Sequence, residues 1–159
     1  MEIKFLVDED FVNYKKPSMF IGFPYCTLKC NKDCGQEVCQ NKALLSEPNI
    51  EIEVEEIIDR YLSNPLTHAI ICGGMEPFDS WPDLIVLIHQ FRRFSDDDIV
   101  IYTGYNKNEV AEKLILLGFE ENVIVKFGRY EPNQDPHFDN ILGINLSSNN
   151  QYAEKIITD

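Results

Sequence analysis

The chain has 159 residues, of which 44% are hydrophobic, enough for one domain with a substantial core and too few to expect two. Lysine and arginine number 14 against 27 aspartates and glutamates, so the net charge is -13. Such a charge repels phosphate backbones and anionic lipid. We therefore expect a single domain over residues 1–159 that binds a small molecule or a protein, with no nucleic acid and no membrane as partner.

The N-terminal sequence MEIKFLVDED is charged from its second residue and has neither a long apolar core nor a small-residue cleavage site. No apolar run approaches the roughly 18 residues of a membrane-spanning helix. These features predict a cytoplasmic protein. In a reducing cytosol, five cysteines, four of them clustered, are expected to be metal ligands or redox groups and not structural disulfides.

In the first half of the chain, strands and helices are expected to alternate. Residues 19–24 (MFIGFP) form an apolar, β-prone run that ends just before the cysteine cluster. Residues 52–62 carry apolar side chains near the i, i+3, i+4 spacing of one helix face and stop at SNP. Residues 68–74 (HAIICGG) predict a buried strand that enters a tight glycine turn, with Cys72 as a core residue.

The second half continues the alternation. A helix is expected over residues 81–94, capped by Asp79 or Ser80, and a strand over residues 98–104. Residues 106–118 open with an Asn to Glu capping box and close on glycine, which predicts another helix. Two further strands are predicted, at residues 122–128 and 141–146.

Strands separated by helices of this length indicate an α/β fold with a mostly parallel sheet and right-handed crossovers. Residues 129–140, with two prolines and several turn formers, are expected to be the one long, mobile loop. Ligands of parallel sheets collect at the carboxyl ends of the strands. The cysteine cluster, GGMEP and YTGY each follow a predicted strand, so they should share one site.

The cluster FPYCTLKCNKDCGQEVCQNKAL spans residues 23–44 and holds Cys26, Cys30, Cys34 and Cys39. Thiolates on one loop suit either a structural zinc, which takes four closed ligands, or an iron–sulfur cluster. The spacings of three, three and four residues do not form two C-x-x-C knuckles, which weakens the zinc interpretation without excluding it.

The segment CGGMEPF (residues 72–78) places two glycines before a carboxylate. Gly73 and Gly74 allow backbone to approach a ligand closely, and Glu76 is an acceptor suited to a ligand's ammonium group. Such a turn alone is more often a plain loop. Its position after a strand of the same sheet as the cysteine loop makes it informative.

The pairing of a C-x-x-x-C opening with a following GGxEP loop resembles the radical S-adenosylmethionine enzymes. Over most of the chain, the sequence is similar to the activating proteins of anaerobic ribonucleoside-triphosphate reductases. The resemblance rests on FIGFPYCTLKC, CQNKAL, ICGGMEPF, IVIYTGY, VKFGRYE and GINLSSNNQ, and IVIYTGY matches most closely.

The resemblance implies a small, incomplete (β/α) barrel of the radical S-adenosylmethionine type, with helices outside. It implies a 4Fe-4S cluster on three cysteines, whose open iron binds S-adenosylmethionine. One-electron reduction then gives a 5'-deoxyadenosyl radical, which takes hydrogen from a glycine of the reductase. Since the cofactors carry the chemistry, no catalytic acid–base side chain is expected. The implied partners are an anaerobic ribonucleotide reductase or other glycyl radical enzyme and a one-electron donor such as flavodoxin.

The family spacing C-x-x-x-C-x-x-C is not kept, because three residues separate Cys30 from Cys34 and eight separate it from Cys39. The resemblance favours Cys26, Cys30 and Cys39 as ligands, since VCQN has the apolar residue before the last cysteine and the asparagine after it; Cys34 is the alternative third ligand. The residues expected to bind S-adenosylmethionine are Tyr25, Val38, Gly73, Gly74, Met75, Glu76, Pro77, Tyr102, Thr103 and Gly104.

Two alternatives remain open. One is a radical S-adenosylmethionine enzyme that acts on a small molecule, similar to 7-carboxy-7-deazaguanine synthase, because the segment FVNYKKPSM (residues 11–19) does not match the activating proteins. The other is a non-enzymatic zinc module that uses all four clustered cysteines. Metal content and cleavage of S-adenosylmethionine distinguish them.

Overall fold

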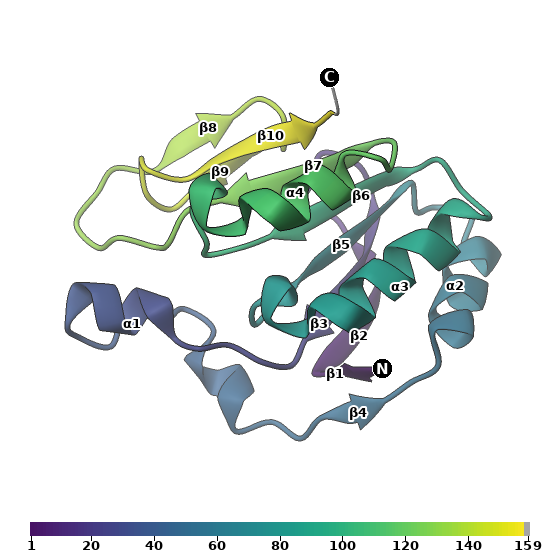
Figure 1. Cartoon of the computed structure of the whole chain (residues 1–159), viewed down its shortest axis with the longest axis horizontal. Coiled ribbons are helices and arrows are strands. Elements are labelled where there is room, and N and C mark those ends of the chain that lie inside the picture. Colours follow the sequence, from purple (N-terminus) through teal and green to yellow (C-terminus); the bar gives the residue numbers. More distant parts are fainter. Residues whose placement is uncertain (158–159) are drawn as a thin grey trace.

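The computed structural model, which describes residues 1–157, is built on a central six-stranded sheet (Figure 1). Its strands lie in the order β10-β7-β6-β5-β3-β2. The mixed α/β class with a mostly parallel sheet is confirmed. The strands are β2 (Phe5–Asp10), β3 (Ser18–Phe23), β5 (Ala69–Gly74), β6 (Asp98–Tyr102), β7 (Val123–Phe127) and β10 (Tyr152–Ile156).

The four inner strands β3, β5, β6 and β7 are parallel, in the order in which they occur along the chain. All four were predicted, because each is a short apolar run between turn formers. The two edge strands, β2 and β10, pair antiparallel with their neighbours. Two small antiparallel pairs stand outside this sheet, β1 (Glu2–Ile3) with β4 (Ile50–Glu51) and β8 (His137–Asp139) with β9 (Ile144–Leu146).

The helices α2 (Val54–Ser63), α3 (Trp81–Arg92) and α4 (Ala111–Leu117) cover one face of the sheet. Their buried side chains pack in a single core with alternate residues of the inner strands, including Cys72, which is fully buried as predicted. The predicted capping box is present, with Asn106 and Glu109, but it opens the 3₁₀ helix η3 (Lys107–Val110), which leads into α4. Similarly, η2 (Pro77–Ser80) precedes α3, and Ser80 makes no capping hydrogen bond.

The opposite face carries a second, smaller core without helices. Ile71, Val100 and Ile124 of the sheet pack there against Tyr14 and Leu142, from the segments flanking the sheet. Toward the carboxyl ends of the strands this face is less filled and opens into a cavity. The sheet therefore separates a packed helical side from a side available for ligand.

Two predictions for the C-terminal third were correct only in part. Residues 141–146 contain the strand β9, but it pairs with β8 and not with the main sheet. The expected loop at residues 129–140 is irregular as far as β8, which lies near its end. The last strand of the main sheet is β10, a polar and partly exposed strand whose sequence lacks an apolar run. Within the described residues, no helix is long and apolar enough to cross a membrane.

Candidate functional site

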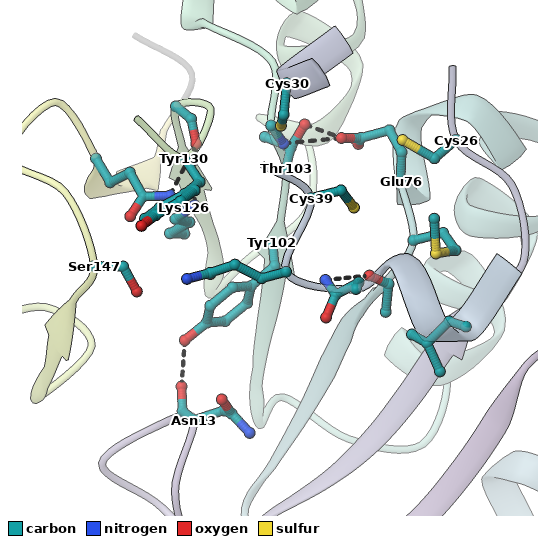
Figure 2. A pocket seen from close by; sticks show the side chains of 18 of the residues that line it. Asn13, Cys26, Cys30, Cys39, Glu76, Tyr102, Thr103, Lys126, Tyr130 and Ser147 are labelled. Carbon is teal, nitrogen blue, oxygen red and sulfur yellow. Dashed lines mark hydrogen bonds between the residues drawn. The ribbon is translucent and has the colours of Figure 1, made fainter. Parts of the chain in front are cut away.

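A cavity of about 550 Å³ opens at the carboxyl edge of the parallel strands. Segments that follow β3, β5, β6 and β7 all contribute to its wall, as the sequence predicted. Figure 2 shows Cys26, Cys30 and Cys39 near Glu76 and Thr103, with Asn13 and Ser147 lying farther off. The predicted site residues that line the cavity are Cys26, Cys30, Cys39, Gly74, Met75, Glu76, Tyr102, Thr103 and Gly104.

Glu76 is a buried carboxylate held by three hydrogen bonds. Its Oε1 accepts from the Thr103 hydroxyl at 2.8 Å and from the Phe78 amide at 3.1 Å, and its Oε2 accepts from the Gly104 amide at 2.9 Å. Burial raises the pKa of Glu76 from 4.5 to about 7, against the opposing effect of these donors. No cationic side chain among residues 1–157 forms an ion pair with it. The carboxylate is thus oriented and has no direct ion pair, and its charge acts on Lys126 of the same cavity wall, whose pKa it raises.

The loop that carries Glu76 lies against the backbone that leads to the first cysteine. The amide of Met75 donates to the carbonyl of Phe23 at 3.1 Å, and the amide of Glu76 donates to the carbonyl of Tyr25 at 2.8 Å. Gly74 has φ of 81°, and a Cβ there would lie 2.8 Å from the Cα of Gly22. Only glycine fits this close approach without strain.

The cysteine loop is folded back on itself by one asparagine. The Oδ1 of Asn31 accepts from the amides of both Val38 and Cys39, each at 2.9 Å. These bonds close the long interval between Cys30 and Cys39. The loop is also joined to the glycine turn, since Nδ2 of Asn41 donates to the carbonyl of Gly74 at 2.8 Å. Cys39 therefore reaches the cavity although eight residues separate it from Cys30.

The thiols of Cys26, Cys30 and Cys39 are electrostatically coupled. Burial raises the pKa of Cys26 to about 11 and also raises that of Cys30, and the Cys39 sulfur contributes to both shifts. Cys34, at the end of the short helix α1 (Lys29–Cys34), is absent from the cavity wall and from these couplings. The geometry thus groups Cys39, and not Cys34, with the first two cysteines.

The donor set suits an iron–sulfur cluster. Three thiols around one end of a cavity are the ligand type that such clusters take. Within residues 1–157, no group of three or more His, Cys, Asp or Glu side chains is set to hold one metal ion.

Four of the expected cofactor-binding residues do not line the cavity. The side chain of Tyr25 is about half exposed and donates a hydrogen bond to Glu2. Val38 contributes its backbone to the cysteine loop through Asn31. Gly73 lies within β5, and Pro77, the residue after Glu76, begins η2. These residues shape the segments that present the cavity-lining side chains.

Two polar features of the wall were not predicted, namely Lys126 as a wall residue and the contact of Tyr102 with Asn13. Lys126 projects from the predicted strand β7 and donates to the carbonyl of Gly128 at 3.1 Å; burial lowers its pKa to about 8. The Tyr102 hydroxyl donates to the carbonyl of Asn13 at 2.5 Å (Figure 2). Alternation along β7 places residue 126 on the cavity face, which strand register would have predicted.

A family model described as 4Fe-4S single cluster domain matches residues 5–152. No curated protein and no solved structure gave a significant match. The match confirms the predicted class of iron–sulfur protein and agrees with the grouping of the cysteine thiols at one cavity. Because it spans nearly the whole sequence, the chain belongs to the 4Fe-4S single cluster domain family.

Proposed function

We propose that this protein is a radical S-adenosylmethionine activase that installs a glycyl radical on an anaerobic ribonucleotide reductase. The observation that carries the proposal is the meeting of three cysteines and a buried, unpaired carboxylate in one cavity. Cys26, Cys30 and Cys39 would hold a 4Fe-4S cluster. When bound, the cluster and S-adenosylmethionine supply reductive cleavage of the sulfonium carbon–sulfur bond, giving a carbon radical that abstracts hydrogen.

Glu76 has the properties required to bind the amino group of S-adenosylmethionine. Its two oxygens are fixed by Thr103, Gly104 and Phe78, so little reorganisation is needed when a ligand arrives. An ammonium ion beside it would form a direct ion pair and lower its raised pKa. The carboxylate acts by binding and orientation, and no proton transfer is assigned to it.

Glycines around this carboxylate keep the cavity open to the ligand. A Cβ at Gly104 would lie 3.7 Å from both Cys30 Sγ and Glu76 Oε2, so a side chain there would project between the two groups. Gly74, with its positive φ, turns the chain so that Met75 and Glu76 face the cavity. The residues from 73 to 77 and from 102 to 104 are thus proposed to form the S-adenosylmethionine site, with Tyr25 and Val38 adjoining it.

Two features of the sheet support the proposal of an incomplete (β/α) barrel. Its inner strands follow one another in chain order, and α2, α3 and α4 all cover the same face. A doubly wound sheet would carry helices on both faces. We accordingly propose that the cavity side corresponds to the inside of the barrel, with the chain acting as a single domain over residues 1–159.

The proposed reaction needs a protein partner and one electron from outside the chain. The substrate would be the glycine segment of an anaerobic ribonucleotide reductase, or of another glycyl radical enzyme. A one-electron donor such as flavodoxin would reduce the cluster in the cytoplasm. The acidic net charge of -13 makes a docking partner with a basic surface the natural complement.

The proposal is tested by anaerobic reconstitution with iron and sulfide, followed by reduction in the presence of S-adenosylmethionine. We expect about four irons per chain and release of methionine and 5'-deoxyadenosine. Addition of an anaerobic reductase should then give the electron paramagnetic resonance signal of a glycyl radical, and Glu76→Gln should weaken S-adenosylmethionine binding. A loaded protein that never cleaves S-adenosylmethionine would contradict the proposal.

A second candidate is a radical S-adenosylmethionine enzyme similar to 7-carboxy-7-deazaguanine synthase. It is favoured by the polar wall of the cavity away from the cysteines, formed in part by Asn13, Asn145, Ser147 and Gln151, which could bind a polar small molecule. Turnover of such a molecule without any protein partner would select this candidate. The zinc module has less support, because Cys34 does not join the other three cysteines.

A further inference from the structure

The short helix that carries Cys30 is not held in place by apolar packing. None of the six residues of α1 is buried, and Leu28, which precedes it, has φ of 55° and gives no side-chain cap. An isolated helix of this length is unstable in water. Figure 1 shows α1 apart from α2 and α3, at the opposite side of the molecule from α2. Other contacts must therefore hold α1 at the cavity.

An ion-pair network supplies these contacts. Arg129, just beyond β7, forms a two-pronged pair with Glu109: Nη1 to Oε2 is 2.8 Å and Nη2 to Oε1 is 2.7 Å. Its Nε lies 2.8 Å from Oδ2 of Asp33 in α1, as an ion pair without hydrogen-bond geometry. Lys29 adds a second link from α1, since its Nζ is 3.7 Å from Oε1 of Glu109 and 4.2 Å from the ring centre of Tyr105.

On the sheet side of this network, the backbone of residues 128 and 129 is held by further hydrogen bonds. The carbonyl of Arg129 accepts from Nδ2 of Asn150 at 2.8 Å, and the carbonyl of Gly128 accepts from Nε2 of Gln151 at 3.2 Å. The amide of Gly128 donates to the carbonyl of Tyr105 at 3.1 Å. The side chain of Arg129 is only 10% exposed. A bidentate pair whose arginine is largely buried on a fixed backbone is stronger than an ordinary surface ion pair.

The network also lies beside a proposed cluster ligand. A Cβ at Gly104 would lie 3.7 Å from the sulfur of Cys30 and 3.9 Å from Cγ of Arg129, so both side chains flank the same glycine. We propose that Arg129 is a positioning residue that holds the cysteine loop against the sheet through Glu109 and Asp33, so that Cys30 faces the cavity before any cluster binds. The inference rests on the proposed function, because Cys30 needs to face the cavity only if it is a cluster ligand.

Hydrogen exchange of the metal-free chain tests this role directly. In Arg129→Gln, amide exchange in residues 29–34 should rise about tenfold, while exchange in β5 and β6 stays unchanged. Arg129→Lys, which keeps the charge but not the fork, should restore part of the protection. The matched control is Lys107→Gln, which removes the exposed pair with Glu154 and should leave residues 29–34 unaffected. Equal exchange in Arg129→Gln and wild type would overturn the proposal.

A second variant covers the case in which Arg129→Gln also disturbs the sheet. Asp33→Asn removes only the partner on α1, whose side chain is 56% exposed and carries no core packing. Exchange in residues 29–34 should then rise roughly threefold, and no rise would overturn the proposal. In the reconstituted protein, both variants should lose visible cluster absorbance to a chelator faster than wild type.

These readouts separate the positioning role from the proposed function. Exchange is measured without metal, so it does not depend on cleavage of S-adenosylmethionine. If exchange is faster in Arg129→Gln but the reconstituted wild type does not cleave S-adenosylmethionine, the role of Arg129 stands and the activase proposal is refuted. If the wild type cleaves S-adenosylmethionine but exchange in Arg129→Gln is unchanged, the activase proposal stands and the role of Arg129 is refuted.

Discussion

The hydroxyl of Thr103, at the end of β6, donates to Oε1 of Glu76, at the end of β5, over 2.8 Å. The two residues are 27 positions apart in the sequence, and the parallel pairing of their strands brings them together. Thr103→Val keeps the shape of the side chain and removes this donor. We expect unfolding of the metal-free protein to become easier by about 2 kcal/mol, because a buried carboxylate loses a hydrogen bond.

Urea denaturation measures this change, and Thr103→Ser is the control because it keeps the hydroxyl. The reconstituted Thr103→Val protein should also bind S-adenosylmethionine about tenfold more weakly, since Glu76 loses orientation. An identical denaturation midpoint for the valine and serine variants would show that the hydrogen bond contributes nothing to the free energy of unfolding.

The stability of the metal-free protein should depend on pH through Glu76. The folded pKa of about 7 lies above the ordinary value of 4.5, so between these values the folded state holds a proton that the unfolded chain has released. Raising the pH through this window therefore destabilises the fold. From pH 5.5 to pH 8, Glu76 should contribute a loss of about 2 kcal/mol.

The measurement compares urea denaturation of wild type and Glu76→Gln at both pH values. Glutamine does not titrate, so the variant should lack this part of the pH dependence, whatever its stability at a single pH. Titrating groups that do not interact with Glu76 cancel in the comparison, whereas the pKa of Lys126, which Glu76 raises, falls further in the variant. Parallel stability–pH curves for the two proteins would refute the raised pKa.

The third ligand of the cluster can be identified with two single substitutions. Cys39→Ala should abolish retention of a 4Fe-4S cluster after anaerobic reconstitution, because Cys39 lines the cavity with Cys26 and Cys30. Cys34→Ala should retain about four irons per chain. Iron and sulfide analysis with the visible spectrum distinguishes the two, and the reverse pattern would make Cys34 the ligand.

Two glycines with positive φ should differ sharply in their response to alanine. At Gly74, φ is 81° and an added Cβ would lie 2.8 Å from the backbone of Gly22. At Gly35, φ is 66° and nothing lies within 4 Å of an added Cβ. We expect Gly74→Ala to cost roughly 3 kcal/mol or more and Gly35→Ala about 1 kcal/mol, because only the first adds a backbone clash to the strain.

Urea denaturation of both variants under the same conditions gives the comparison. The Gly74→Ala protein should in addition lose S-adenosylmethionine binding, since the turn that presents Glu76 is displaced. Comparable costs for the two substitutions would mean that the chain around Gly22 moves to accept the extra methyl group.

The inner sheet could be predicted from the sequence because its strands are largely apolar on both faces and end at or are closely followed by glycine or proline. The convergence of the cysteine loop, Glu76 and Thr103 followed from the same reasoning, since carboxyl ends of parallel strands share one edge. β10 could not be predicted in this way, because it is an edge strand with polar and exposed residues. Its pairing depends on β7, which the local sequence does not encode.

Long-range polar contacts were the other part beyond the reach of sequence reasoning. Arg129 lies in a segment read as a loop, and nothing in the local sequence pairs it with Glu109 and Asp33. Asn31 similarly closes the interval between Cys30 and Cys39 through two backbone amides. Such contacts depend on side-chain position in the folded chain, whereas apolar periodicity reports only which face of an element is buried.

Because α1 contributes no buried residue, the rest of the fold does not depend on it. Loss of a bound cluster would leave α1 held by the ion pairs of Arg129 and Lys29, and the six-stranded sheet and its helices would keep their packing. The protein without its cluster would then remain folded, and iron and sulfide could rebuild the cluster on it. The part of the chain that would bind the cluster is therefore separate from the part that keeps it folded.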